Sequence, residues 1–324
     1  MITSNITFRE LFAKSQVKDF VKFITGNCYI PDLDISLKEM QKQFPDWDAE
    51  SIAAGLNRFF DLLDAGVNTV YDFYDRDACT AEEDKADTKL FYMPGKKGMP
   101  FAIICPGGAY RAICTLKEGF TTGARLNQMG YSAFILCYRV GGRGLLPKPM
   151  DDLAAALKFI LQNAERLGVD ARDYAVIGYS AGGHLAGEWG TELVGASCYG
   201  LPGPSAIFMA YTPSEVILSK DGENPMDRAM RDTLFGDQDF DTARERYCIA
   251  RHINQNYPPA YLWHCKDDPI VPIRSMYEMI DSLNRYGVPY KYREVSAGGH
   301  GFGMGEFYES KGWLEEAVAF WQDR

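Results

Sequence analysis

The chain of 324 residues is 46% hydrophobic and carries a formal net charge of −10 at pH 7. This length is enough for one large hydrophobic core or two smaller ones, and the negative charge argues against nucleic acid as a partner. No apolar run reaches the 18 residues that a membrane span requires, so we expect no membrane partner either.

The first residues and the cysteines indicate where the protein works. Residues 1–5 lack the basic stretch and apolar core of a signal peptide, so we expect a cytoplasmic protein. The eight cysteines follow no spacing pattern, and several lie in apolar runs (Cys105, Cys137, Cys265), which is typical of buried reduced thiols. Because the sequence contains no CxxC pair and no cluster of His and Cys, we expect no metal and no cofactor.

The first 66 residues have a helical pattern. Two capping boxes, beginning at Thr7 and Ser36, and an N-cap at Asp48 each precede apolar residues at helical spacing, and Gly66 ends the pattern. We therefore predict an N-terminal helical extension over residues 1–66, followed by a catalytic domain over residues 67–324. The extension could pack on the main domain, form a lid or mediate an oligomer contact.

Strand and helix patterns alternate through the rest of the chain. We predict strands at residues 67–74, 89–92, 101–105, 131–138, 175–179, 206–211, 260–264 and 290–295, with an acidic turn region at 80–87. Helices are predicted at residues 119–129, 153–163 (opened by Asp151 and Asp152), 275–286 and 313–321. This alternation favours an α/β fold with a doubly wound, mostly parallel sheet, in which functional sites lie at the carboxyl ends of strands.

Ser180 lies at the junction of one strand and one helix. The apolar residues 175–177 lead into Gly-Tyr-Ser-Ala-Gly, and a helical pattern follows. Gly-x-Ser-x-Gly between a strand and a helix is typical of a nucleophile elbow, in which a tight turn exposes the serine hydroxyl above the sheet. An N-cap serine is the competing interpretation of the bare pattern.

A serine hydroxyl needs a base and an orienting acid to act as a nucleophile, and in this fold the chain order is serine, acid, histidine. The sequence has four histidines. His184 is one helical turn beyond Ser180 and is interpreted as a packing residue. His252 and His264 precede any plausible acid, and His264 lies in an apolar strand. His300, in a glycine-rich loop after the last strand, is the remaining candidate for the base.

Two neighbouring aspartates compete for the role of the acid. Asp267 and Asp268 both follow the strand predicted at residues 260–264. Asp268 precedes Pro269, which keeps it out of the helical region and favours a turn at the strand end. Asp267 is the alternative, and capping the turn is a structural role open to either residue.

The reaction also requires N–H groups that stabilise an oxyanion. One donor is expected from Ala181, the residue after the nucleophile. A second is expected from the loop at residues 105–110, whose glycines permit a close approach of the backbone to the substrate, although an ordinary Pro-Gly turn is an alternative.

Taken together, these motifs resemble α/β-hydrolase-fold esterases of the group related to hormone-sensitive lipase, and most of all bacterial acetyl esterases and acetyl-xylan or feruloyl esterases. The matching stretches are residues 105–110 (CPGGAY), 118–119 (EG), 138–139 (YR), 178–186 (GYSAGGHLA), 267–272 (DDPIVP) and 299–302 (GHGF).

The resemblance implies particular site residues. It makes Ser180 the nucleophile, Asp268 the acid and His300 the base. It places the oxyanion donors at three backbone positions (Gly108, Ala109, Ala181), and Tyr110 and Tyr179 are weaker candidates for substrate contacts. The chain departs from the pattern at two positions: Pro106 replaces a common histidine, and Ala109 replaces the usual glycine.

The expected function is hydrolysis of short acyl esters, foremost acetyl, through an acyl-enzyme, with acetylated sugars or xylo-oligosaccharides as substrates. The charged segment between Tyr211 and Tyr257, which includes Lys220, is unlike an apolar lid for fatty chains. Alternatives are an aryl-formamide hydrolase or a peptidase on the same fold, or a non-catalytic binding protein. A peptidase that binds a free amino terminus needs paired acids, and Glu82-Glu83 is interpreted instead as part of a solvated turn.

Overall fold

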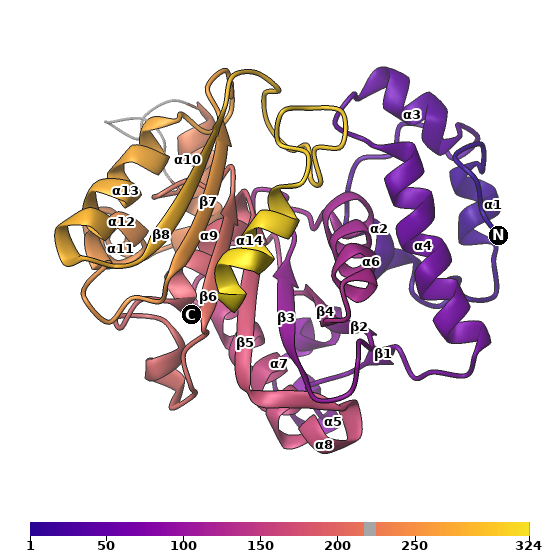
Figure 1. Cartoon of the computed structure of the whole chain (residues 1–324), viewed down its shortest axis with the longest axis horizontal. Helices are drawn as coiled ribbons and strands as arrows, with labels where there is room; N and C mark the ends of the chain where they lie inside the picture. The colour runs from indigo at the N-terminus through magenta and orange to yellow at the C-terminus, as the bar shows by residue number, and fades with distance from the viewer. Residues whose placement is uncertain (217–224, 324) are drawn as a thin grey trace.

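The computed structural model describes residues 1–216 and 225–323, so Lys220 of the charged segment lies outside the described residues. Its centre is an eight-stranded sheet of order β1-β2-β4-β3-β5-β6-β7-β8 (Figure 1). Six strands run parallel, whereas β1 and β2 pair antiparallel with their neighbours. The strands are β1 (Val70–Tyr71), β2 (Lys89–Met93), β3 (Met99–Cys105), β4 (Ser132–Cys137), β5 (Val169–Tyr179), β6 (Ala206–Ala210), β7 (Ala260–Cys265) and β8 (Tyr290–Val295).

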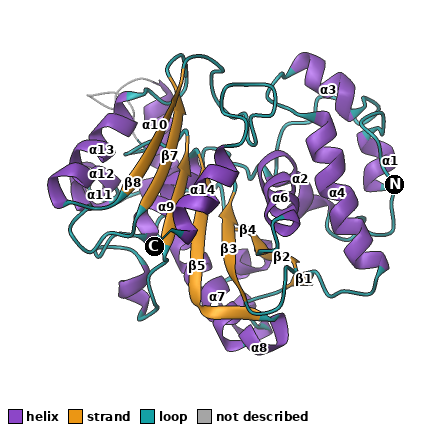
Figure 2. Cartoon of the chain, in the orientation of Figure 1, coloured by secondary structure: helices purple, strands orange, loops and turns teal. Residues whose placement is uncertain are grey.

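Helices cover both faces of this sheet, with α6 and α14 on one face and α7 and α9 on the other (Figure 2). The α-helices are α1 (Phe8–Phe12), α2 (Val21–Thr25), α3 (Leu37–Gln43), α4 (Ala49–Asp64), α5 (Arg76–Ala81), α6 (Thr121–Gln128), α7 (Lys148–Gln162), α8 (Ala164–Leu167), α9 (Ala181–Trp189), α10 (Pro225–Phe235), α11 (Phe240–Arg246), α12 (Ile249–His252), α13 (Arg274–Tyr286) and α14 (Trp313–Gln322). Helical segments of other types are η1 (Glu83–Asp87), η2 (Thr115–Phe120) and η3 (Ala196–Tyr199). The predicted doubly wound, mostly parallel sheet is confirmed.

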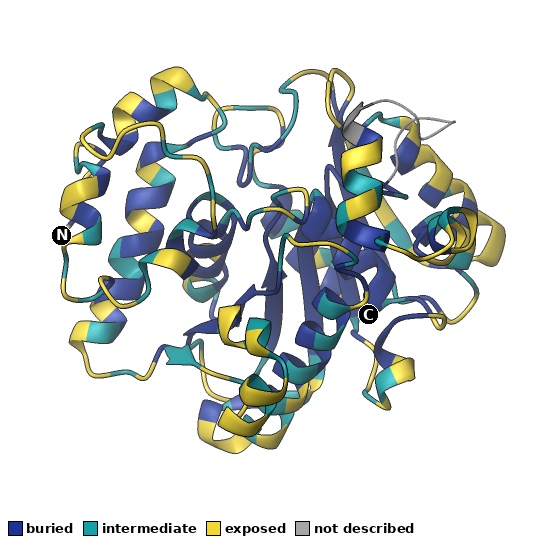
Figure 3. Ribbon diagram, turned by 180° about the vertical axis from the view of Figure 1, so that it is seen from behind, coloured by how far each residue is buried: buried dark blue, intermediate teal, exposed yellow. Residues whose placement is uncertain are grey.

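The N-terminal helices α1 to α4 lie beside the sheet at the end that carries β1 and β2 (Figure 1). Both predicted capping boxes form, and the Asp48 side chain accepts the Ser51 N–H as an N-cap. Helix α4 packs against α6 and η2, and its buried stripe belongs to the same hydrophobic core as the strands (Figure 3). These contacts show that the N-terminal helices pack on the main domain. A lid, an oligomer contact and a domain boundary at residue 66 stay predictions.

Three local predictions were wrong. Residues 67–74 form only the two-residue strand β1, and the acidic turn region forms α5 and η1. Helix α7 begins at Lys148, several residues before the predicted start. Asp152 therefore lies within the helix and does not open it, and its fully buried side chain pairs with Arg139.

The structure also tests the expectations about the cysteines and about membrane spans. All eight cysteines are free thiols, and Cys105, Cys137 and Cys265 are buried, as the sequence predicted. Among the described residues, no helix combines the length and the apolar character needed to cross a membrane.

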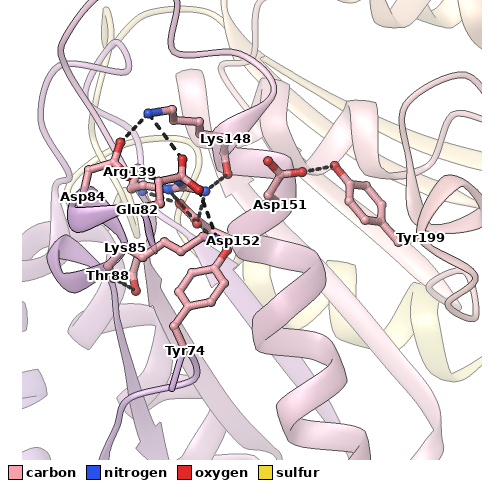
Figure 4. A network of polar contacts seen from close by, with 10 residues as sticks. All are labelled: Tyr74, Glu82, Asp84, Lys85, Thr88, Arg139, Lys148, Asp151, Asp152 and Tyr199. Carbon is pink, nitrogen blue, oxygen red and sulfur yellow. Dashed lines mark hydrogen bonds and ion pairs between the residues drawn. The ribbon is translucent and has the colours of Figure 1, made fainter. Parts of the chain in front are cut away.

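A polar network around Arg139 anchors the end of β4 (Figure 4). The Arg139 side chain is only 2% exposed and forms ion pairs with three carboxylates, those of Glu82, Asp84 and Asp152. Tyr74 donates its hydroxyl to Asp152 at 2.8 Å. Glu82, expected in a solvated turn, keeps 38% of its side chain exposed, but its carboxylate also belongs to this network, which the sequence did not predict.

We expect Arg139→Met to lower the free energy of unfolding by about 3–5 kcal/mol, because it leaves the Asp152 carboxylate buried without its cation. Urea denaturation measures the loss. Arg172→Met is the matched control, since the Arg172 side chain is 89% exposed and its pair with Asp170 should contribute nothing measurable. Equal stability of the two variants would contradict the role assigned to the buried network.

Candidate active site

Ser180 stands in the sharp turn between β5 and α9, with φ 50° and ψ −119°. Such backbone angles are strained for serine and persist only where the surroundings enforce them. Here the neighbouring glycines allow the enforcing contacts: a Cβ on Gly178 would lie 2.1 Å from the Gly182 carbonyl oxygen, and one on Gly182 would lie 2.0 Å from the Cys105 carbonyl oxygen. The predicted tight turn is thus present, and only glycine fits on either side of the serine.

The structure brings together the three side chains that the sequence had selected. His300 Nε2 lies 2.9 Å from Ser180 Oγ, and His300 Nδ1 lies 2.7 Å from Asp268 Oδ2. If Nδ1 carries the proton donated to Asp268, the Nε2 lone pair is left to accept the proton of the serine hydroxyl. The three residues follow β5, β7 and β8, so the carboxyl ends of parallel strands assemble the site.

The Asp268 carboxylate is enclosed by hydrogen-bond donors. Oδ1 accepts the N–H groups of Ile270 and Val271, at 2.8 and 2.9 Å. Oδ2 lies 3.2 Å from His264 Nε2, in addition to its bond with His300. Burial by itself would raise the pKa of Asp268, but the bonds from the two histidines outweigh it and lower this pKa to about 2.

Asp267, the competing aspartate, has a different environment. Its carboxylate accepts the N–H groups of Gly298 and Gly299, at distances of 2.8–3.1 Å. It therefore holds the start of the loop that carries His300, whereas Asp268 contacts the imidazole itself. The geometry favours Asp268 over Asp267 as the partner of His300.

The loop after β3 passes directly beside Ser180. A Cβ on Gly107 would lie 3.0 Å from the Ser180 Cβ. The amides of the next two residues (Gly108, Ala109) and that of Ala181, at the start of α9, donate no hydrogen bond to any described residue. Within residues 1–216 and 225–323, these three N–H groups are therefore without an acceptor and suited to an oxyanion, although this role stays a prediction.

The departure at Ala109 has a conformational consequence. Its φ is 54°, in the left-handed region, where an L-residue with a Cβ costs about 1–2 kcal/mol relative to the right-handed conformation. Gly108 has φ 133°, and a Cβ there would lie 2.1 Å from the Ala112 carbonyl oxygen. Alanine keeps the N–H at position 109 under strain, whereas position 108 admits only glycine.

The two tyrosines suggested as substrate contacts do not expose their side chains, so this suggestion was wrong for both. Tyr110 is 1% exposed and its hydroxyl lies 2.9 Å from His184 Nδ1. Tyr179 is fully buried and its hydroxyl hydrogen-bonds to Thr122. Both side chains belong to the buried core.

The other histidines are placed as the sequence suggested, with one addition. His184 is buried in α9, and burial lowers its pKa to about 4. His252 lies at the end of α12, and its Nε2 is 2.8 Å from the Glu245 carbonyl oxygen. His264 is a buried core residue, but it also contacts the Asp268 carboxylate, which the sequence analysis missed. Its spacing of four residues before the candidate acid was the available signal.

No cluster of three metal-ligating side chains occurs among the described residues.

The lowered pKa of Asp268 makes stability depend on pH. A carboxyl group whose pKa is depressed in the folded state stabilises the fold above its unfolded pKa of about 3.9, and this contribution is lost as the pH falls toward the folded value. We expect Asp268→Asn to be less stable than the wild type at pH 6, with the difference shrinking as the pH falls from about 4 to about 2. Urea denaturation at each pH measures the difference, and a difference independent of pH would contradict the assigned environment.

Comparison with known proteins places the chain in a family. The model of the BD-FAE family matches residues 90–283. The acetylxylan esterase of Xylanibacter ruminicola is 23% identical over 251 residues, which cover 74% of this chain and 48% of that protein. Endo-1,4-beta-xylanase B of Butyrivibrio fibrisolvens is 25% identical over 218 residues, which cover 65% of this chain and 34% of that protein. The chain thus spans between a third and a half of the length of these two relatives.

Among solved structures, the acetyl ester-xyloside bifunctional hydrolase of Caldicellulosiruptor lactoaceticus has a TM-score of 0.66 and 24% identity, covering 79% of this chain and 96% of that one. This similarity shows a shared α/β-hydrolase fold. Because the family model spans more than half of the sequence, from β2 into α13, the chain belongs to the BD-FAE family.

Proposed function

We propose that this protein is a serine carboxylesterase that removes short acyl groups, foremost acetyl, from acetylated sugars such as xylo-oligosaccharides. The observation that carries the proposal is the continuous hydrogen-bonded chain from Asp268 through His300 to Ser180 Oγ, with bond lengths of 2.7 and 2.9 Å.

Each residue of this chain has a defined role in the proposed mechanism. Ser180 Oγ attacks the acyl carbonyl carbon while His300 Nε2 takes the hydroxyl proton and then returns it to the departing alcohol. Asp268 keeps Nδ1 protonated and stabilises the imidazolium that forms. Water, deprotonated by His300, then attacks the acyl-enzyme and releases the carboxylic acid, and Ser180 recovers its proton.

The unpaired amides of Gly108, Ala109 and Ala181 supply the oxyanion donors in this proposal. Backbone donors that are already oriented need no reorganisation when charge develops on the carbonyl oxygen, and one such donor typically contributes about 10²–10³ in kcat. The contacts that Gly107 and Gly182 make with neighbouring backbone support this rigidity.

Two observations support a small acyl group on a polar alcohol. The relative from Xylanibacter ruminicola is named an acetylxylan esterase, and the structural neighbour from Caldicellulosiruptor lactoaceticus an acetyl ester-xyloside hydrolase. In addition, a cavity of about 260 Å³ has both polar and apolar lining residues, which include Asp84, Arg139 and Gly141, and the Gly141 N–H donates to the Tyr110 carbonyl at the end of the oxyanion loop (residues 105–110). Paired charges and backbone groups of this kind suit the hydroxyl groups of a sugar.

The alternatives have less support. A peptidase that recognises a free amino terminus needs paired acids, and the Glu82 carboxylate is engaged by Arg139 and Lys85. A binding protein without activity would not need the strained turn and the aligned histidine at Ser180.

Substitution of the triad should abolish hydrolysis without unfolding the chain. We expect Ser180→Ala and His300→Ala each to lower kcat on p-nitrophenyl acetate by at least about 10³-fold, since the nucleophile or its base is removed. Asp268→Asn should cost far more turnover than Asp267→Asn, because only Asp268 contacts the imidazole. Wild-type turnover by Ser180→Ala would refute the assignment, and the reverse ranking of the two aspartates would transfer the acid role to Asp267.

The acyl preference is tested with p-nitrophenyl esters of increasing chain length. A lipase gains about 0.8 kcal/mol for each methylene that it buries, so its activity rises over several carbons. We expect kcat/KM to peak at acetyl or propionyl and to fall steeply by octanoyl, with no activation at a lipid interface. Release of acetate from acetylated xylo-oligosaccharides is the companion measurement. A maximum at octanoyl or beyond would remove the acetyl preference and leave the serine mechanism intact.

A further inference from the structure

One buried carboxylate touches two of the loops that meet at Ser180. Glu118 lies in η2 and is only 1% exposed. Its Oε2 accepts the N–H of Gly107 at 2.6 Å, and its Oε1 accepts the hydroxyl of Tyr211 at 2.8 Å. Gly107 immediately precedes the candidate oxyanion donors, and Tyr211 is the first residue after β6.

The Tyr211 hydroxyl extends this connection to a third loop. It accepts the N–H of Gly303 at 3.0 Å while it donates to Glu118, and Gly303 is three residues beyond His300. The Tyr211 ring is fully buried and meets the His300 ring edge-on, with 4.9 Å between their centroids. A single chain of hydrogen bonds therefore runs from the oxyanion loop through Glu118 and Tyr211 to the loop that carries the base.

The chemistry of this position requires a carboxylate. Both of its partners donate, and a carboxylate offers two acceptor oxygens, whereas an amide offers one acceptor and one donor. A glutamine could satisfy Gly107 only by pointing its NH₂ at Tyr211 Oη, which already accepts from Gly303. One buried polar group would then be left unpaired at the site, which typically costs about 1–3 kcal/mol.

Burying this carboxylate is costly, and the structure reduces the cost with a cation. Burial raises the pKa of Glu118, while the neighbouring ammonium of Lys117 and the bonds from Gly107 and Tyr211 act in the opposite direction. Lys117 itself pairs with Asp46 from the N-terminal segment. Because burying a charge often costs more than its pairing returns, the role of this carboxylate is in placing the two loops that it joins and not in stability.

We propose that Glu118 is a positioning residue that sets the oxyanion loop and the His300 loop relative to each other, through the Gly107 amide and the Tyr211 hydroxyl. The proposal rests on the serine-esterase function proposed above, because it concerns the same oxyanion donors and the same base. Glu118 contacts neither Ser180 nor His300 through a hydrogen bond among the described residues, so we assign it a positioning role and not a catalytic one.

The main test is Glu118→Gln, which keeps the size of the side chain and removes one acceptor. A misplacement of about 1 Å can cost about 10²-fold in rate, so we expect kcat on p-nitrophenyl acetate to fall by about that factor while KM changes by less than about threefold. The matched control is Glu188→Gln. Glu188 lies in α9 and is as buried as Glu118. Among the described residues, its carboxylate forms no hydrogen bond with the oxyanion loop or with the loop that carries His300. Burial raises the pKa of Glu188, and neither carboxylate oxygen has a hydrogen-bond partner among the described residues, so activity should be unchanged in this variant.

Inhibition by phenylboronic acid separates positioning from loss of folded enzyme. Boron bonds to the serine oxygen to give a tetrahedral anion that uses the oxyanion donors, and the inhibition constant does not depend on the fraction of active molecules. We expect this constant to rise in Glu118→Gln in parallel with the loss of kcat/KM, and to stay constant in Glu188→Gln. An unchanged constant, or a kcat within about threefold of the wild type, would overturn the proposal.

Tyr211→Phe gives a second test, which decides the matter if Glu118→Gln does not fold. It keeps the carboxylate and its bond to Gly107 but removes the link to Gly303. We expect about a tenfold loss of kcat, again with a higher inhibition constant, and a double variant no worse than Glu118→Gln alone, because both residues act through one network. Wild-type kinetics in Tyr211→Phe would overturn the connection to the His300 loop.

Failure of the proposed function would look different from failure of this inference. If the wild type hydrolyses no ester, the esterase proposal fails. The rate at which a fluorophosphonate labels Ser180, followed by intact mass, then replaces turnover as the measure of site geometry. If the wild type hydrolyses esters and Glu118→Gln does so equally well, only the positioning role fails.

Discussion

The contact on which the site depends is the close approach of two backbone turns, one after β3 and one after β5. Gly182 lies so near the Cys105 carbonyl, and Gly107 so near Ser180, that Cβ atoms at these glycines would collide with or crowd their neighbours. This approach puts the strained serine beside three backbone amides that donate to no other group in the described part of the chain. Because interiors are close-packed and resist deformation, the strain at Ser180 is held rather than relaxed.

The remaining loops are joined to this pair of turns by carboxylates that act as acceptors for several donors. Asp268 receives two backbone amides and two histidines, and Asp267 receives two glycine amides at the start of the His300 loop. Glu118 joins the oxyanion loop to Tyr211. Each carboxylate fixes backbone that has few constraints of its own, because glycine-rich loops lose the most conformational freedom on folding.

The N-terminal segment is connected to the same region. The Ile113 N–H, three residues after the oxyanion loop, donates to the Gly26 carbonyl at 2.6 Å, and Asp46 pairs with Lys117 beside Glu118. A Cβ on Gly301, next to His300, would lie 3.3 Å from Lys117 Nζ and 3.6 Å from the Asp46 carboxylate. The segment before β1 therefore contacts residues that hold the loops of the site in place, as well as packing beside the sheet.

The sequence by itself determined the fold class, the sharp turn at Ser180 and the selection of His300 as the candidate base, because these depend on local periodicity, on glycine spacing and on chain order. It left Asp267 and Asp268 as competitors, since two adjacent carboxylates differ only in which donors surround them after folding. Only the tertiary structure showed that Tyr110 and Tyr179 are buried and that Asp152 is buried within α7. It also showed that the Glu118 carboxylate accepts hydrogen bonds from Gly107 and Tyr211. These outcomes depend on contacts between residues far apart in the chain, and no local pattern encodes such contacts.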